Sequence, residues 1–259
     1  MKGVILAGGE GTRLFPVTLA ISKQLIPIYN KPLIYYPLST LMLSGIQEIL
    51  IITKRKHLQS FRDLLGDGTK FGISIDYEIQ KYSNGIPEAL LIGEKFIKND
   101  SVALILGDNF FYGPGMGRSL NVNQKLGAKI FVKEVADPEK FGVLEIDTSG
   151  QPLRIVEKPA NTKSGLAVTG LYFYNNEAID IAKTLKPSDR GETEITDLNN
   201  IFLKRGDLEI QTLPRSTVWF DTGTFEGIQQ ASEFVRIIEC NQKIEVGNPS
   251  EIAQINGWV

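Results

Sequence analysis

The 259-residue sequence is poor in the two side chains that most often hold metals or cross-link chains, with one cysteine, Cys240, and one histidine, His57. A single cysteine excludes a disulfide within the chain and is typical of a reducing compartment, so we expect a cytoplasmic protein. One histidine and one cysteine also argue against a zinc site, because structural zinc takes four such ligands. His57 follows a basic run and is expected at a solvated helix start.

Long apolar runs and an excess of one charge are also missing. No apolar stretch approaches the roughly 20 residues that span a bilayer, and the N-terminus begins with the strand-like KGVILA rather than a targeting leader. The formal net charge is -2, which argues against a protein that coats nucleic acid. We therefore expect an intracellular protein with no membrane and no nucleic-acid partner.

Short apolar runs alternate with helical patterns through the first half of the chain. Strands are expected at 3–7, 48–53, 73–79, 102–106 and 128–134, and helices at 34–44, 57–65 and 87–98. Pro37 fits its helix only in the first turn, where its missing N–H needs no partner. This alternation predicts an α/β, Rossmann-like fold with a mixed, mostly parallel sheet flanked by helices.

The second half of the chain is less regular. Residues 142–147 and 153–157 predict an antiparallel hairpin around Ser149-Gly150, followed by a strand at 167–174 and helices at 176–185, 194–206 and 223–243. No repeat, low-complexity stretch or linker divides the sequence. We therefore expect a single domain over 1–259 with a small antiparallel region.

Three glycines follow the first strand in GVILAGGEGTRL: Gly8, Gly9 and Gly11. Glycine lets the backbone approach a ligand closely, and ligands of open α/β sheets bind at the carboxyl ends of strands. Successive amides there can hold phosphate oxygens, and Arg13 and Lys23 add two cations. The dinucleotide pattern G-x-G-x-x-G has Leu14 at its third glycine, and the Walker pattern is absent. A plain turn is the alternative interpretation of this loop.

Two acidic residues follow later apolar strands in the same way. Asp108 follows LILG in LILGDNFFYG, and Asp221 follows VWF in VWFDTGT. Each could instead cap a turn or a helix, which is a common use of aspartate. If the two carboxylates met beside a polyphosphate they would suit Mg²⁺, which takes a couple of carboxylates plus substrate oxygens. The spacing alone leaves their meeting open.

Two further stretches carry weaker signals. IVEKPAN offers Glu157 as an acceptor for hydroxyls and Lys158 as a cation for phosphate, although such a pair is more often plain surface. DYEIQKYSNG places Gln80 at a strand end and Gly85 before a helix. A carboxamide both donates and accepts hydrogen bonds, as reading the edge of a pyrimidine requires.

Together these motifs resemble the sugar nucleotidyltransferase family, in its thymidylyl-transferring branch. The resemblance covers essentially the whole chain, since GGEGTRLFPVT, SKQLIPIYNKPLIYYPLSTLMLSGI, LLGDGTKFG, LILGDNFFYG, DPEKFGVLEID, EKPANTKSGLAVTGLYFY, RGETEITDLN and WFDTGT follow in the family's order. The tyrosine-rich IYYPLSTLM favours the thymidylyl branch. The activity that this resemblance implies is a Mg²⁺-assisted reaction of glucose 1-phosphate with dTTP that gives dTDP-glucose and pyrophosphate, as in the first step of dTDP-rhamnose-type biosynthesis.

The resemblance also implies a role for each matching residue. The nucleotide-binding residues would be Gly8, Gly11, Thr12, Arg13, Gln24, Gln80, Gly85 and Asp108. The sugar-phosphate-binding residues would be Asn109, Gly142, Glu157, Lys158 and Val168. Asp108 and Asp221 would ligate Mg²⁺, and Arg13, Lys23 and Lys158 would act on the phosphates as catalytic residues. The family further implies a homo-oligomer, either a dimer or a tetramer.

The sequence departs from the family pattern at two places. Pro87-Glu88 stands where members often carry Ala-Gln or Ala-Glu, which predicts a stiffer base-binding loop with Pro87 in a first helical turn. The sequence ends at NGWV, where longer relatives continue into a region that builds a subunit interface and a regulatory site, so feedback inhibition is left open. Uridylyl or adenylyl transfer, another hexose 1-phosphate, a silent nucleotide-sugar sensor and a dinucleotide-dependent oxidoreductase are the alternative functions.

Overall fold

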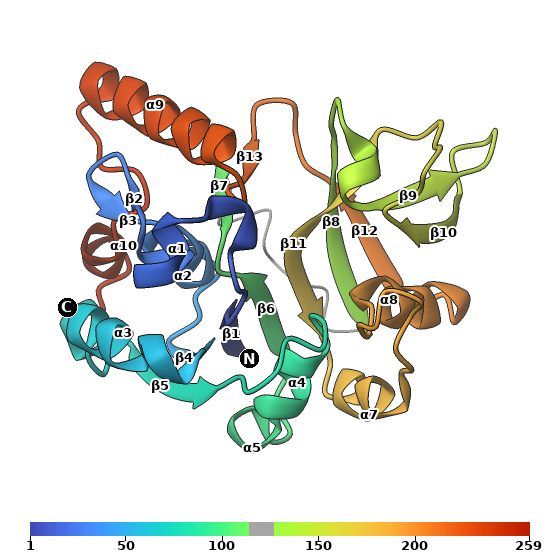
Figure 1. Cartoon of the computed structure of the whole chain (residues 1–259), viewed down its shortest axis with the longest axis horizontal. Coiled ribbons are helices and arrows are strands. Elements are labelled where there is room, and N and C mark those ends of the chain that lie inside the picture. The colour runs from blue at the N-terminus through green and yellow to red at the C-terminus, as the bar shows by residue number, and fades with distance from the viewer. Residues whose placement is uncertain (114–126) are drawn as a thin grey trace. The chain divides into compact units, whose positions relative to one another are not determined.

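The computed structural model describes residues 1–113 and 127–259. The described residues form two compact units, both drawn in Figure 1. Among the described residues, unit 1 comprises 1–81, 105–113 and 215–259, and unit 2 comprises 82–104 and 127–214. The expected single domain stays a prediction.

Unit 1 is built on a parallel sheet of apolar strands. β1 (Lys2–Ala7) pairs with β4 (Glu48–Thr53), which pairs with β5 (Ser74–Ile79). The end of β6 (Val102–Leu106) also belongs to this unit, where the Gly107 N–H donates to the Leu6 carbonyl at 2.9 Å. Because parallel strands end at one edge of a sheet, the loops after β1, β5 and β6 begin close to one another.

Helices surround this sheet largely as the sequence predicts. They are α1 (Val17–Ala20), α2 (Tyr35–Leu43), α3 (Leu58–Leu65), α9 (Phe225–Gln242) and α10 (Pro249–Ile255), with the 3-10 turns η1 (Thr12–Leu14), η2 (Lys23–Leu25), η3 (Arg55–His57) and η4 (Thr69–Phe71). Pro37 lies in the first turn of α2, as expected, and Gly45 follows that helix with φ 77°. The sequence did not predict α1, α10 or the hairpin of β2 (Pro27–Ile28) and β3 (Lys31–Pro32).

An aromatic cluster fixes a second, two-stranded sheet in unit 1. β7 (Asn109–Tyr112) pairs antiparallel with β13 (Val218–Asp221), which sets Asp221 opposite Asn109. The fully buried ring of Phe110 lies 4.8 Å from the Tyr36 ring and 5.6 Å from the Phe220 ring, between centroids. Because such rings pack in specific geometries, the cluster holds the ends of β7 and β13, and the acidic residues there, in place.

Unit 2 contains mostly antiparallel strands. These are β8 (Ala128–Glu134), β9 (Gly142–Ile146), β10 (Pro152–Glu157), β11 (Leu166–Tyr174) and β12 (Leu208–Thr212), and they pair in the order β10-β9-β11-β8-β12. The 3-10 turn η5 (Pro138–Lys140) lies between β8 and β9 along the chain. The β9–β10 hairpin confirms the predicted turn, in which Asp147 Oδ1 accepts from the Ser149 N–H at 2.8 Å. β8 and β12 form the parallel pair of this unit.

The helices of unit 2 are α4 (Glu88–Ile92), α5 (Glu94–Ile97), α7 (Glu177–Thr184) and α8 (Ile195–Lys204). The prediction of one helix over 87–98 is wrong, because the chain breaks at Gly93 between α4 and α5. Glycine is among the weakest helix formers, which accounts for the break. On α8, the Asn200 carboxamide accepts from the Ile155 N–H and donates to the Ile155 carbonyl, both at 2.8 Å, and so covers the edge of β10.

The strand pairing confirms the predicted fold class, an α/β fold with a mixed sheet flanked by helices and a small antiparallel region. In residues 1–113 and 127–259, no helix combines the length and the apolar character that crossing a membrane requires.

Candidate active site

The glycine loop leaves the carboxyl end of β1 and packs against the residue that follows β5. A Cβ built on Gly8 would lie 2.0 Å from Oε1 of the buried Gln80, so a larger residue would push that carboxamide away. Gly11 has φ 64°, and a Cβ there would lie 2.9 Å from Cγ2 of Thr18. The Thr18 hydroxyl also donates to the Gly11 carbonyl at 2.8 Å. The loop therefore depends on glycine at both positions, and it brings Gly8 and Gln80 together.

The residues after this loop differ in exposure. Thr12 and Arg13 lie in η1 and are exposed, with 59% of the Arg13 side chain accessible to solvent. Gln24 is buried, and the Ser22 hydroxyl donates to its Oε1 at 2.6 Å. A Cβ on Gly107 would lie 3.0 Å from Cγ of Gln24, so this side chain packs behind the loop that follows β6.

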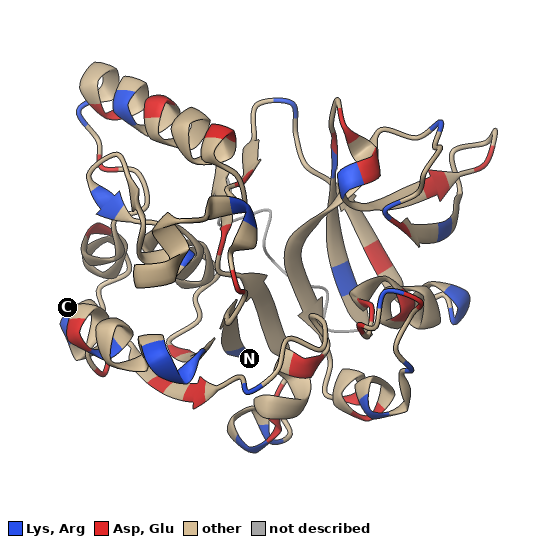
Figure 2. Ribbon diagram, in the orientation of Figure 1, with Lys and Arg blue, Asp and Glu red and all other residues tan. Residues whose placement is uncertain are grey.

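Two ion pairs occupy the strand ends of unit 1. Lys23 Nζ contacts Asp108 Oδ2, and the two side chains are only 11% and 14% exposed. Arg13 Nη2 lies 3.9 Å from Asp221 Oδ2, whose side chain is 24% exposed. Figure 2 shows basic and acidic segments side by side around these strand ends. The structure thus brings four of the predicted site residues into one charged cluster.

The backbone accounts for the positions of the two carboxylates. The Thr222 N–H and hydroxyl both donate to the Asp108 carbonyl, at 3.0 and 2.7 Å, which ties the end of β13 to the loop after β6. Asp221 does not cap α9, because Thr224 is the N-cap of that helix and accepts from the Gly227 N–H at 3.1 Å. Asp221 does cap the turn before the helix, where its Oδ1 accepts from the Gly223 N–H at 3.2 Å, while its Oδ2 faces Arg13. Asp108 likewise directs its carboxylate to Lys23.

The two carboxylates differ in the direction of their pKa shifts. Burial raises the pKa of Asp221, and the negative charge of Asp108 raises it further. Burial also acts to raise the pKa of Asp108, but the charge of Lys23 and its hydrogen bond outweigh burial and hold that pKa below its ordinary value. Two neighbouring carboxylates of this kind favour a bound cation.

The chemistry of this donor set fits Mg²⁺, which takes a couple of carboxylates and keeps other positions for phosphate oxygens. Among residues 1–113 and 127–259, no three His, Cys, Asp or Glu side chains gather into a metal-binding group. Asp108 and Asp221 would therefore hold such an ion together with oxygens of a substrate.

In unit 2, Glu157 lies opposite Gly142 at one end of the β9–β10 hairpin. The Thr196 hydroxyl donates to Glu157 Oε2 at 2.7 Å, and Arg190 Nη1 lies 3.3 Å from Glu157 Oε1. A Cβ on Gly142 would lie 3.1 Å from the Thr196 hydroxyl, so glycine leaves this contact undisturbed. The carboxylate is thus oriented by residues of α8 and of the segment before it.

Lys158 follows β10 with φ 43°, a left-handed conformation for a residue that is not glycine. Its N–H donates to the Phe141 carbonyl at 2.9 Å, which helps to hold this conformation. Such backbone strain costs on the order of 1–3 kcal/mol and clusters at functional sites. The backbone at Lys158, next to Glu157, is therefore held in a conformation that most residues avoid.

The sequence analysis also singled out Gly85, Pro87 and Val168 in unit 2. Gly85 has φ 110°, and a Cβ there would lie 2.0 Å from the Thr193 carbonyl oxygen. Pro87 stands at the start of α4, as expected. Val168 is buried on β11, opposite Val132 on β8.

Several residues that contact the predicted site received no role from the sequence, among them Thr18, Ser22 and Thr222, described above. Arg190 and Thr196 contact Glu157, and Trp219 Nε1 donates to Asn109 Oδ1 at 2.6 Å. Their segments, RGETEITDLN and WFDTGT, stood out as motifs in the sequence. A local pattern does not show which distant side chain a residue contacts. The two motifs were therefore the only sign in the sequence that these residues belong near the site.

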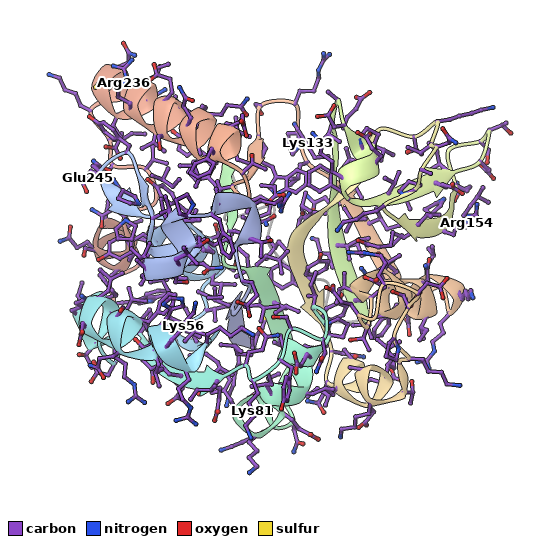
Figure 3. All side chains as sticks on the ribbon, viewed as in Figure 1. Lys56, Lys81, Lys133, Arg154, Arg236 and Glu245 are labelled. Atoms are coloured by element: carbon purple, nitrogen blue, oxygen red, sulfur yellow. The ribbon has the colours of Figure 1, made fainter. Side chains whose placement is uncertain are left out.

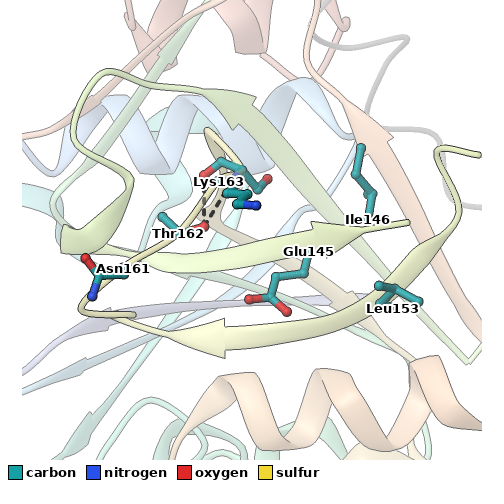
Figure 4. Close-up of a pocket in the computed structure, with 7 residues that line it drawn as sticks. Glu145, Ile146, Leu153, Asn161, Thr162 and Lys163 are labelled. Carbon is teal, nitrogen blue, oxygen red and sulfur yellow. Dashed lines mark hydrogen bonds between the residues drawn. The ribbon is translucent and has the colours of Figure 1, made fainter. Parts of the chain in front are cut away.

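A groove of about 390 Å³ runs along the β9–β10 hairpin and the segment that follows β10 (Figure 4). Its lining consists of Glu145, Ile146, Leu153, Asn161, Thr162, Lys163 and Ser164. Ile146 pairs with Pro152, whereas Gly142 and Glu157 pair at the opposite end of the ladder. Arg154 projects from this hairpin and binds Glu145 at 2.7 Å (Figure 3). The predicted sugar-phosphate residues of unit 2, Gly142, Glu157, Lys158 and Val168, are not among the residues that line this groove.

Known proteins resemble the chain over nearly its whole length. Residues 2–237 match the family model described as nucleotidyl transferase. The glucose-1-phosphate thymidylyltransferase of Mycolicibacterium smegmatis is 52% identical over 100% of this chain and 90% of its own length.

Solved structures agree with this match. One from Bacillus anthracis, described as a glucose-1-phosphate thymidylyltransferase in complex with a sucrose, is 42% identical with a TM-score of 0.84, over 91% of this chain and 95% of that one. A UDP-glucose pyrophosphorylase complexed with UDP-glucose is 26% identical with a TM-score of 0.80, over 91% and 98%. The chain therefore belongs to the nucleotidyl transferase family.

Proposed function

We propose that this protein transfers a thymidylyl group from dTTP to glucose 1-phosphate, giving dTDP-glucose and pyrophosphate. The main structural support is the unit 1 cluster, in which two carboxylates and two cations lie at the strand ends next to a glycine loop. The choice of substrates comes from the Mycolicibacterium smegmatis relative, which is 52% identical to this chain and is named for this activity.

In this reaction a phosphate oxygen of glucose 1-phosphate bonds to the α-phosphorus of dTTP, and the bond from that phosphorus to the β-phosphate oxygen breaks. The attacking phosphate is already an anion at neutral pH, so it needs no general base. The barrier lies in the repulsion between two anions and in the charge on the departing pyrophosphate. Arg13, Lys23 and the amides of the glycine loop would stabilise that charge.

Mg²⁺ is the metal that this proposal assigns to Asp108 and Asp221, which fit it by their donor chemistry. When bound, it supplies positive charge to the triphosphate and orients its oxygens. The chain itself would hold the triphosphate through Gly11, Thr12 and Arg13. Gln24 would support these contacts from its buried position, and Gln80, beside Gly8, would read the thymine with Gly85.

For the sugar phosphate, Glu157 would accept hydrogen bonds from the hydroxyls, and Lys158 would bind the phosphate. Holding both reactants in one geometry accounts for much of the rate gain in such transfers. Gly142, Val168 and Asn109 remain proposed lining residues. The dimer or tetramer, the cytoplasmic location and the dTDP-rhamnose-type pathway also stay predictions.

The test is a pyrophosphate-release assay with glucose 1-phosphate, Mg²⁺ and one of four nucleoside triphosphates, namely dTTP, UTP, ATP or CTP. We expect the fastest release with dTTP and none when glucose 1-phosphate is omitted. Fastest release with UTP would instead favour uridylyl transfer. Nucleotide binding without any release would favour a silent sensor, and galactose 1-phosphate in place of glucose 1-phosphate checks the sugar.

A further inference from the structure

Lys23 places its ammonium group between the glycine loop and Asp108. Its Nζ contacts Asp108 Oδ2, and both side chains are nearly buried. A Cβ built on Gly11 would lie 3.5 Å from Cβ of Lys23, and one on Gly9 would lie 3.9 Å from its Cε. The aliphatic part of Lys23 therefore passes along the loop, and its charge lies on the carboxylate that would hold a metal.

The charges of this cluster balance one another in pairs. Asp108 is paired with Lys23, and Asp221 with Arg13. A bare divalent cation that approached the two carboxylates would also meet the two basic side chains, whose repulsion offsets much of the attraction. A metal–triphosphate complex differs because its net charge is negative, and its phosphate oxygens offer Lys23 and Arg13 new partners.

We propose that Lys23 occupies the cation position of Asp108 until a metal–triphosphate complex arrives, so that the protein discriminates against the bare divalent cation. On binding, Lys23 exchanges the Asp108 carboxylate for phosphate oxygens and leaves that carboxylate to the metal. This inference rests on the proposed function for the identity of the triphosphate, but it concerns the order in which the cluster accepts its ligands.

The test uses Mn²⁺ as a probe of the divalent site, titrated into the protein without nucleotide while the electron paramagnetic resonance signal reports free Mn²⁺. The wild-type protein should bind Mn²⁺ weakly, with a Kd above about 1 mM. Lys23→Met should bind it at least about tenfold more tightly, which corresponds to about 1.4 kcal/mol. Addition of dTTP to the wild type should tighten Mn²⁺ binding by a similar factor beyond the binding that dTTP alone shows in a titration without protein.

Two variants separate this effect from a general change in charge. Lys54 pairs with Glu10 of the same glycine loop at 3.1 Å, so Lys54→Met removes a nearby positive charge without releasing Asp108. We expect Lys54→Met to change Mn²⁺ binding by less than about twofold, because Lys54 pairs with Glu10, which is 55% exposed, and not with either carboxylate of the cluster. In Lys23→Met combined with Asp108→Asn, the gain in affinity should disappear.

Tight Mn²⁺ binding by the nucleotide-free wild type, with a Kd below about 0.1 mM, would overturn the inference. So would a folded Lys23→Met that binds Mn²⁺ no better than the wild type. If thermal unfolding shows that Lys23→Met does not fold, Lys23→Gln replaces it. The wild-type titrations with and without dTTP decide as well, because equal affinities refute the inference.

These outcomes are distinct from those of the transfer assay. An active wild-type enzyme whose Lys23 variants gain no affinity for Mn²⁺ would refute the order of binding and leave thymidylyl transfer standing. An inactive wild type whose Lys23→Met variant binds Mn²⁺ tightly would refute the transfer reaction, while the exchange at Asp108 would hold.

Discussion

The charged residues of unit 1 and those of unit 2 are held in place by different means. In unit 1 each carboxylate of the cluster faces a cation, Lys23 at Asp108 and Arg13 at Asp221. In unit 2 the Glu157 carboxylate is held by the neutral hydroxyl of Thr196 and by Arg190, which it shares with Glu194.

This difference matches the chemistry of the two proposed ligands. A cluster of paired charges can exchange its internal partners for a triphosphate and a divalent cation, so it suits a ligand of high charge. Glu157 differs because a hydroxyl holds one of its oxygens, while its cation Arg190 is shared with Glu194. This carboxylate keeps a fixed acceptor for neutral sugar hydroxyls, so it suits a ligand recognised by hydrogen bonds. Substitutions in unit 1 should therefore change turnover most, whereas substitutions around Glu157 should change the use of the sugar phosphate.

The largest effect is expected from Asp108→Asn. It removes a proposed metal ligand and leaves the nearly buried Lys23 without its carboxylate, so turnover should fall by about 100- to 1000-fold. Steady-state pyrophosphate release at saturating substrates measures this loss. Asp147→Asn is a matched control, because that carboxylate serves an exposed turn of unit 2. Near-normal turnover of Asp108→Asn would remove this carboxylate from the mechanism.

Lys158→Ala should have the next largest effect, because it removes the cation proposed for the sugar phosphate. We expect roughly a hundredfold loss of turnover, the size typical of a major charge stabiliser. The KM for dTTP should stay unchanged, which initial rates at varied dTTP would show. Lys163→Ala, in the groove along the hairpin, should behave like the wild type. An equal loss in both lysine variants would contradict the assignment.

A smaller effect is expected from Thr196→Val, which keeps the shape of the side chain but removes the hydroxyl that holds Glu157. The loss of one hydrogen bond should lower kcat/KM for glucose 1-phosphate by up to about tenfold. Thr196→Ser restores the hydroxyl and should recover most of this loss. If Thr196→Val raises the KM for dTTP instead, Thr196 serves the nucleotide rather than the sugar.

The smallest effect is expected from Leu153→Ala in the groove of Figure 4, where Leu153 is 58% exposed. A surface change of this kind should alter the free energy of unfolding by less than about 0.5 kcal/mol. Denaturant titration and the pyrophosphate assay would both stay near wild-type values. A marked loss of activity with normal stability would extend the functional region of unit 2 into the groove.

The regular part of unit 1 was predictable because its strands are continuous apolar runs and its loops begin with glycine or aspartate. The short β12 strand, LEIQT, escaped prediction because its polar residues interrupt any apolar run. The break at Gly93 escaped because the apolar spacing continues across it. Pairing with β8 decided the structure of β12, whereas the weak helix propensity of glycine decided the break at Gly93.

The residue types of the candidate site were predictable, but most of their partners were not. Strand ends followed by glycine or aspartate indicated where Gly8, Asp108 and Asp221 would stand. That Lys23 meets Asp108, or that Thr196 meets Glu157, depends on how distant segments pack. The aromatic cluster around Phe110 that holds β7 and β13 is one such packing effect, and the spacing of residues along the sequence does not predict it.

The most direct measurement is the anomalous scattering of Mn²⁺ in crystals of the protein grown with dTTP, where Mn²⁺ replaces Mg²⁺. We expect one strong peak bound by carboxylate oxygens of both Asp108 and Asp221, at about the 2.0–2.1 Å that is typical of Mg²⁺, with Lys23 moved onto the phosphates. A peak that contacts the triphosphate but neither carboxylate would show that these two residues do not hold the metal.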